Sequence, residues 1–163
     1  MVLGGVKWDE VESEEEPRAM LLGEYEHALD DKNRVTLPAR FRQAFADGVF
    51  VTKGFDPCLL VYPPKGWSRF VDGQLGGLTP FSREARQMNR FVFASAIQTD
   101  LDKQGRMGLI APLLQHAGLK RGVIVAGVQD HLELWEPEAW RREVDDVGGR
   151  ADLVAERLAA TQS

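Results

Sequence analysis

Short segments of alternating or clustered apolar residues predict β-strands along most of the chain. Residues 49–53 and 58–62 are rich in β-branched and aromatic side chains, and the turn-forming letters GFDP follow the first of them. This arrangement is typical of two strands joined by a tight connection. The same criteria predict strands over residues 21–29, 35–37, 49–53, 58–62, 97–101, 106–110, 123–128 and 131–135.

Helices are predicted where proline precedes apolar residues spaced three or four apart. Pro38 can open a short helix that places Phe41 and Phe45 on one face. Residues 81–96 form the longest helical stretch before the second half of the chain, with apolar residues roughly on one stripe. Further helices are predicted from Pro63 and Pro64, near residues 112–117, from Pro137 and over residues 150–160.

The order of these elements repeats. Residues 29–34 read LDDKNR and residues 101–106 read LDKQGR. At offsets of 72 or 73 the correspondence continues, in the pairs Leu37 and Leu109, Phe41 and Leu113, Gly54 and Gly127, Tyr62 and Trp135, Trp67 and Trp140. An internal repeat fixes the architecture before its elements are assigned. The chain is therefore expected to be α+β, built from two strand–loop–strand–helix–hairpin units of about 45 residues that pack on each other.

Each copy contains a tight turn in its Asp-x-x-x-Arg stretch. Asn33 in the first copy corresponds to Gly105 in the second, and these residue types best tolerate positive φ. Asp30 and Asp102 are expected to accept backbone N–H hydrogen bonds within the turn, which is a structural role.

Composition agrees with one folded unit or two small joined ones. The chain has 163 residues, 44% of them apolar, and one cysteine, Cys58, which excludes an internal disulfide. No window reaches the roughly 18 apolar residues of a membrane span, and the N-terminus is acidic rather than a signal peptide. Nothing indicates an oxidising compartment, so we expect a cytoplasmic protein. Residues 1–19 are acidic and are expected to be a disordered extension, either a functional tail or the product of a mis-assigned start before Met20.

Charge is distributed unevenly. The net charge of −5 conceals net charges of −8 in residues 1–31, +7 in residues 32–120 and −4 in residues 121–163. Residues 32–42, KNRVTLPARFR, contain four cations and no acid. The total charge of −5 opposes a negatively charged partner, but the basic middle of the chain favours one. We give the uneven distribution more weight than the total.

Catalytic or metal chemistry has little support. The three histidines, His27, His116 and His131, have no neighbour at zinc-ligand spacing, and the chain lacks phosphate-binding and nucleophile-elbow motifs. We therefore predict no enzyme activity, no cofactor and no metal. The paired aromatic residues of the two copies are expected in the core or between copies, with base stacking as the minority interpretation.

The cations of the Asp-x-x-x-Arg stretch favour nucleic-acid recognition. A turn alone needs one special residue and does not need Lys32 and Arg34 as well. Arginine presents a planar fork suited to guanine edges, and lysine suits phosphates. A protruding β-turn is narrow enough to enter a major groove.

The chain resembles the MraZ family, within the wider group of AbrB/SpoVT-like swapped-hairpin DNA-binding proteins. The resemblance covers Met20 to about Trp140 and rests on MLLGEYEHALDDKNRVTLPARFR, VTKGFDPCLLVYP, SREARQMNRFVFASA, LDKQGR and LELWEPEAW. It implies tandem double-split β-barrel units related by a pseudo-two-fold axis. The implied segments are an extension 1–19, a first repeat 24–66, a linker and helix 67–95, a second repeat 96–139 and a helical tail 140–163.

The resemblance also implies a function. Members of this family are nucleoid-associated regulators of the bacterial division and cell-wall gene cluster, and they form rings that bind short G-rich direct repeats of double-stranded DNA. The recognition loop of the family corresponds to Lys32, Asn33 and Arg34, next to Arg40 and Arg42. Asn33 stands where the family usually has glycine.

The second copy departs further from the family. It lacks the proline and basic residues that the first copy has at Pro38, Arg40 and Arg42. Its loop, with Lys103 and Arg106, is therefore expected to be a secondary DNA contact or an assembly surface. Two other classes of protein are weighed against a DNA-binding regulator: an antitoxin or ring scaffold of the same fold, which two full copies oppose, and a small enzyme, which no residues support.

Overall fold

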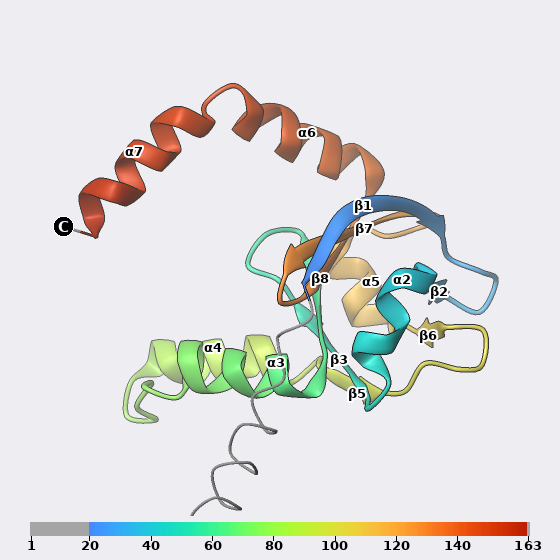
Figure 1. Ribbon diagram of the computed structural model, residues 1–163. Coiled ribbons are helices and arrows are strands. Elements are labelled where there is room, and N and C mark those ends of the chain that lie inside the picture. Colours follow the sequence, from blue (N-terminus) through green and yellow to red (C-terminus); the bar gives the residue numbers. More distant parts are fainter. Residues whose placement is uncertain (1–19, 163) are drawn as a thin grey trace, which may run out of the picture.

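The structure is a computed structural model that describes residues 20–162. The expected disordered extension, residues 1–19, lies outside the described residues. The chain is mixed α+β with antiparallel sheets, as the repeat predicts (Figure 1).

All predicted strands are present, each within a few residues of its expected position. The first copy contributes β1 (Leu21–Ala28), β2 (Arg34–Thr36), β3 (Val49–Lys53) and β4 (Cys58–Tyr62). The second copy contributes β5 (Ile97–Thr99), β6 (Arg106–Gly108), β7 (Gly122–Gln129) and β8 (Leu132–Trp135). Strands β5 and β6 are each two residues shorter than predicted.

The helices follow the same order. They are α2 (Ala39–Arg42), α3 (Pro64–Phe70), α4 (Arg83–Phe93), α5 (Ala111–Ala117), α6 (Pro137–Gly148) and α7 (Ala151–Thr161). Proline occupies the first turn of α3, α5 and α6, where its missing N–H costs no hydrogen bond. Side chains cap two helices: the Ser82 hydroxyl accepts from the N–H of Ala85 at α4, and the Glu136 carboxylate accepts two backbone N–H groups at α6.

The two copies exchange strands. The larger sheet has the order β1-β7-β8-β4-β3-β5, and β2 pairs with β6 in a second, two-stranded sheet. Each copy thus pairs its first strand with the third strand of the other copy, β1 with β7 and β5 with β3. Exchanging the copies reverses the strand order of the large sheet and leaves all pairings unchanged.

The register carries the same symmetry. Val35 lies opposite Met107, and Leu60 lies opposite Glu133. These are equivalent positions of the repeat at offsets of 72 and 73, so one approximate two-fold relation accounts for the centre of both sheets.

Both faces of the large sheet are covered, which explains why β4 is buried along its whole length. One face packs against the β2–β6 pair, α2 and α5, in a core that includes the predicted Phe41 and Phe45, each 1% exposed. The other face is covered by α3, α4 and α6. Tyr62 and Trp135 are buried there, and Trp67 and Trp140 pack against them, which confirms the core interpretation of these aromatic pairs.

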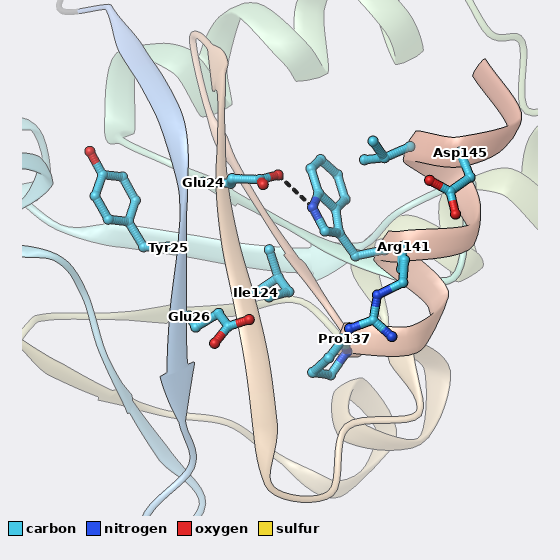
Figure 2. Close-up of a pocket in the computed structure, with 9 residues that line it drawn as sticks. Glu24, Tyr25, Glu26, Ile124, Pro137, Arg141 and Asp145 are labelled. Carbon is cyan, nitrogen blue, oxygen red and sulfur yellow. Dashed lines mark hydrogen bonds between the residues drawn. The ribbon is translucent and has the colours of Figure 1, made fainter. Parts of the chain in front are cut away.

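The two C-terminal helices bury none of their residues fully. Helix α6 is tied to β1 because the Trp140 indole Nε1 donates to Glu24 Oε2 at 2.6 Å, across the groove drawn in Figure 2. Helix α7 extends away from the body of the molecule (Figure 1). Among the described residues, none of the helices is both long and apolar enough to cross a membrane.

A polar cluster surrounds His131 at the β7–β8 turn. His131 Nδ1 lies 2.7 Å from Asp130 Oδ1, and Nε2 lies 3.6 Å from Glu133 Oε2. Burial opposes protonation, but hydrogen bonds to Glu133 and Asp130 outweigh it and raise the pKa of His131. Burial likewise opposes ionisation of Glu133, yet hydrogen bonds from His131 and Trp135 lower its pKa.

A raised folded-state histidine pKa stabilises the fold at low pH, and this contribution disappears as the pH rises through that pKa. We therefore expect His131→Asn to reduce the free energy of unfolding more at about pH 5.5 than at about pH 8.5. Urea unfolding of both proteins at the two pH values measures this difference. An equal loss at both pH values would show that the imidazolium is not stabilised in the fold.

Candidate nucleic-acid interface

Two loops with the same internal hydrogen bonds form the candidate site. We call residues 29–34 loop 1 and residues 101–106 loop 2. In loop 1, Asp30 Oδ1 accepts from the backbone N–H of Lys32 at 2.9 Å and of Arg34 at 2.8 Å, and Asp30 Oδ2 accepts from Arg34 Nε at 2.7 Å. The N–H and the guanidinium of Arg34 hold the pKa of Asp30 below its ordinary value.

Loop 2 repeats this arrangement. Asp102 Oδ1 accepts from the N–H groups of Gln104 and Arg106 at 2.9 Å, and Asp102 Oδ2 accepts from Arg106 Nε at 2.7 Å. Each aspartate therefore satisfies the backbone of its turn and also orients the arginine that ends the turn.

The loops lie side by side at one end of the molecule (Figure 1). Strands β2 and β6, which follow them, pair directly. Two further backbone hydrogen bonds cross between the copies, from Leu37 N to Gly105 O at 2.9 Å and from Leu109 N to Asn33 O at 3.0 Å. The loops are consequently supported by the same small sheet and the core beneath it.

Backbone conformation explains the residues at the turn positions. Asn33 has φ +57° and Gly105 has φ +77°. The prediction of positive φ at these two positions is confirmed. Asparagine adopts positive φ at lower cost than most residues. Loop 1 therefore keeps its shape although it has Asn33 in place of glycine.

The two arginines differ in what their terminal nitrogens contact. Arg106 Nη2 lies 3.3 Å from Gln104 Oε1. The position equivalent to Gln104 in loop 1 is Lys32, which offers no acceptor. Among the described residues, no side chain or carbonyl accepts a hydrogen bond from the terminal nitrogens of Arg34. The guanidinium of Arg34 is thus oriented through Nε while its outer edge is available to a ligand.

The remaining basic residues of the first copy occupy different places. Arg40 is exposed, donates to the Tyr25 hydroxyl at 2.5 Å and lies over the Tyr25 ring. Arg42 is half-buried, and its Nε donates to Leu37 O at 3.0 Å. Its guanidinium also lies against Gly105, so it contacts loop 2 rather than loop 1. The contact of Arg42 with loop 2 cannot be predicted from the sequence alone, because the exchange of strands brings it about.

The contact with Arg42 predicts an unequal cost for two glycine substitutions. Gly105 and Gly118 both have positive φ, but a Cβ on Gly105 would lie 2.2 Å from Arg42 Nε, whereas a Cβ on Gly118 would meet nothing within 4 Å. Gly118→Ala should lower the free energy of unfolding by about 1–2 kcal/mol, the backbone cost alone. Gly105→Ala should cost about 1 kcal/mol more, because Arg42 must give up its hydrogen bond.

Urea unfolding of both variants tests this difference. In an Arg42→Ala background, where the clash is absent, Gly105→Ala should cost no more than Gly118→Ala does in the wild type. Equal destabilisation by the two glycine substitutions would contradict the packing of Arg42 on loop 2.

Other candidate residues prove to be structural. The Nε2 atom of His116 lies 2.9 Å from Gly54 O and thus ties α5 to the β3–β4 turn. Cys58 is buried, and burial raises the pKa of its thiol, so it packs as a small apolar residue. His27 is half-buried, and burial with Arg42 nearby lowers its pKa. In the described part of the chain, no group of three or more acidic, histidine or cysteine side chains could hold a metal.

A groove between β1 and α6 is a weaker candidate for the site. Figure 2 shows Glu24 and Glu26 on its side of β1, with Tyr25 on the opposite side of that strand. Asp145 lines the groove from α6, and Arg141 is paired with Glu138 at 2.6 Å. This excess of acidic groups disfavours nucleic acid, so loops 1 and 2 remain the candidate interface.

Proteins of known family resemble this chain over most of its length. A protein-family model described as "MraZ protein, putative antitoxin-like" matches residues 20–88 and again residues 92–154. The chain is 40% identical over 140 residues to the transcriptional regulator MraZ of Roseiflexus castenholzii, covering 86% of this chain and 97% of the relative. It is 39% identical over 140 residues to the regulator of the same name from Thermomicrobium roseum, covering 86% and 98%.

The fold and the paired loops define a protein made of two copies of one α+β unit, each with its own loop. The two matches of the family model correspond to these two copies. This chain belongs to the MraZ family. Both relatives are named transcriptional regulators, which agrees with the expectation that the chain is not an enzyme.

Proposed function

We propose that this chain is a transcriptional regulator that binds double-stranded DNA in a sequence-specific manner through loop 1. One observation carries the proposal: Arg34 is oriented by Asp30 through Nε, and its two terminal nitrogens have no acceptor among the described residues. A guanidinium held in this way presents a preformed fork, which matches the O6 and N7 acceptors of guanine in the major groove.

The other residues of the interface take supporting roles in this proposal. Lys32 is exposed and contacts phosphate, and Asn33 maintains the turn. Arg40 and Arg42 add positive charge at the same end of the molecule. Loop 2 is a secondary DNA contact or an assembly surface through Lys103 and Arg106.

We infer that the fold is a tandem of AbrB/SpoVT-like swapped-hairpin units that form a double-split β-barrel. The pairing of β1 with β7 and of β5 with β3 supports this inference. The proposed segments remain 24–66 and 96–139 for the repeats, 67–95 for the linker and connecting helix, and 140–163 for the tail.

We further infer that the chain assembles with itself into a ring. Two similar but unequal copies present different faces, and a contact between unlike faces closes into a ring or continues as a filament. All loops then point the same way around the ring, so they meet DNA sites arranged as direct repeats. Such a regulator acts in the cytoplasm at the nucleoid, on the division and cell-wall gene cluster.

The family description also mentions antitoxins, which make an interaction module the alternative function. Two complete copies joined by the ordered helix α4 do not favour this alternative, because antitoxins of this fold usually have one copy and a disordered tail.

A gel-shift titration against the upstream region of the chain's own gene tests the proposal. We expect binding at concentrations that leave a shuffled duplex of equal composition unbound, with the preference retained at several salt concentrations. Equal affinity for both duplexes would contradict sequence-specific regulation.

A further inference from the structure

Each loop is flanked by a connector from the other copy, as a consequence of the strand exchange. The connectors join the short helix of each copy to its third strand. Beside loop 1, the N–H of Leu29 donates to Arg121 O at 2.7 Å, and Ala28 pairs with Gly122. Beside loop 2, Thr99 pairs with Val49, the residue after the connector of the first copy.

The two connectors have opposite charge. At an offset of 73, Lys120 and Arg121 of the second copy correspond to Asp47 and Gly48 of the first. Loop 1 itself is neutral and its connector carries +2, whereas loop 2 carries +1 and its connector carries −1. The exchange of strands therefore makes the surroundings of loop 1 the more positive of the two.

The side chains of the basic connector are available to a ligand. Lys120 and Arg121 are both exposed, and neither side chain forms an ion pair or hydrogen bond with the described residues. Together with Arg142 of α6 they line a surface groove of about 580 Å³. The acid in this groove, Glu136, accepts the two backbone N–H groups that begin α6.

We propose that Lys120 and Arg121, supplied by the second copy, bind DNA phosphates at the rim of the groove that loop 1 enters. This inference rests on the proposed function of loop 1. It assigns the second copy a role in DNA binding that does not depend on loop 2.

The dimensions of loop 1 and of DNA agree with this assignment. Leu29, bonded to the connector, stands three residues before Lys32 at the tip, so the two residues are at most roughly 10 Å apart. The major groove is about 8.5 Å deep. When the tip reaches the base edges, the connector lies near the rim, where the phosphates are.

Salt-dependent DNA binding by the double variant Lys120→Ala, Arg121→Ala tests the proposal. Each lost phosphate contact lowers the slope of log affinity against log salt by about 0.9, so the double variant should lose about two units of slope. Its affinity should fall for operator and shuffled DNA alike, and its preference between them should stay. The Leu29 hydrogen bond uses the backbone carbonyl of Arg121, so the fold should be retained.

The matched control is Lys65→Ala, Arg69→Ala. These exposed residues lie on α3, away from both loops (Figure 1), and their loss changes the net charge equally. The control should keep the wild-type salt slope. A double variant at the connector that binds with wild-type slope, while Arg34→Ala loses operator preference, would overturn this inference alone. A wild-type protein that does not prefer its operator would instead overturn the proposed function.

Discussion

Arg34→Ala should abolish the preference of the protein for its operator while leaving the fold intact. The expected loss is about 1–3 kcal/mol per site, or roughly 5- to 150-fold in affinity, because the bidentate contact with a guanine disappears. Fluorescence anisotropy with operator and shuffled duplexes measures the loss. Since Arg34 also binds Asp30 in the turn, a thermal melt must show that the variant remains folded.

The structure supplies a matched control. Arg106 makes the same contacts with Asp102 in loop 2, so Arg106→Ala removes an equivalent turn interaction at the other loop. Under the proposed function it should reduce operator preference far less. Lys32→Ala should weaken binding to all sequences and lower the salt slope by about one unit. Wild-type operator preference in Arg34→Ala would refute readout by loop 1.

The second large effect concerns the number of recognition sites on the DNA. One loop makes only a few base contacts, so affinity should arise from several loops of one ring that bind together. Avidity of this kind can raise affinity by about 10²–10⁴-fold without a new type of contact. Binding should therefore increase steeply from a duplex with one recognition box to duplexes with two or three in direct repeat.

Spacing provides the control for this prediction. Shifting one box by half a helical turn, about 5 base pairs, places it on the opposite side of the duplex and should remove most of the gain. Light scattering on the same samples should show a closed oligomer. A stable monomer or two-fold dimer that binds a single box with full affinity would contradict the ring.

The elements of the fold were largely predictable because each has a local cause. The two turns were recognisable from Asn33 and Gly105, and both residues have the positive φ that their types suggest. Proline and the pair Phe41 and Phe45 located the short helix of the first copy. Strands β3 and β4 begin and end at the predicted residues, because their apolar runs are bounded by turn-forming sequence.

The contacts between copies were not predictable in the same way. A repeat says that two units pack together but not that β1 pairs with β7 of the other unit. The packing of Arg42 on Gly105 and the position of Arg121 beside Leu29 both follow from that exchange. In the sequence, the connector residues Lys120 and Arg121 are separated from loop 1 by more than 80 positions and lie outside the basic segment of residues 32–42.

The candidate site was predictable in its residue types and not in its detailed contacts. Lys32 and Arg34 could be predicted as DNA-binding residues from the sequence because a turn alone does not require two cations. The difference between the two arginines depends on Gln104, whose side chain lies 3.3 Å from Arg106 Nη2 and has no counterpart in loop 1. The contacts within the two loops therefore distinguish Arg34 from Arg106.

The central claim is that Arg34 reads a guanine, and a cycle of atomic changes on both partners tests it most directly. Replacing single operator guanines by 7-deazaguanine removes the N7 acceptor and leaves base pairing unchanged. At the guanine that Arg34 contacts, this replacement should weaken binding of the wild-type protein by about 1 kcal/mol or more and should not weaken binding of Arg34→Ala further. If every replacement has the same effect on both proteins, Arg34 does not contact a guanine and the account is wrong.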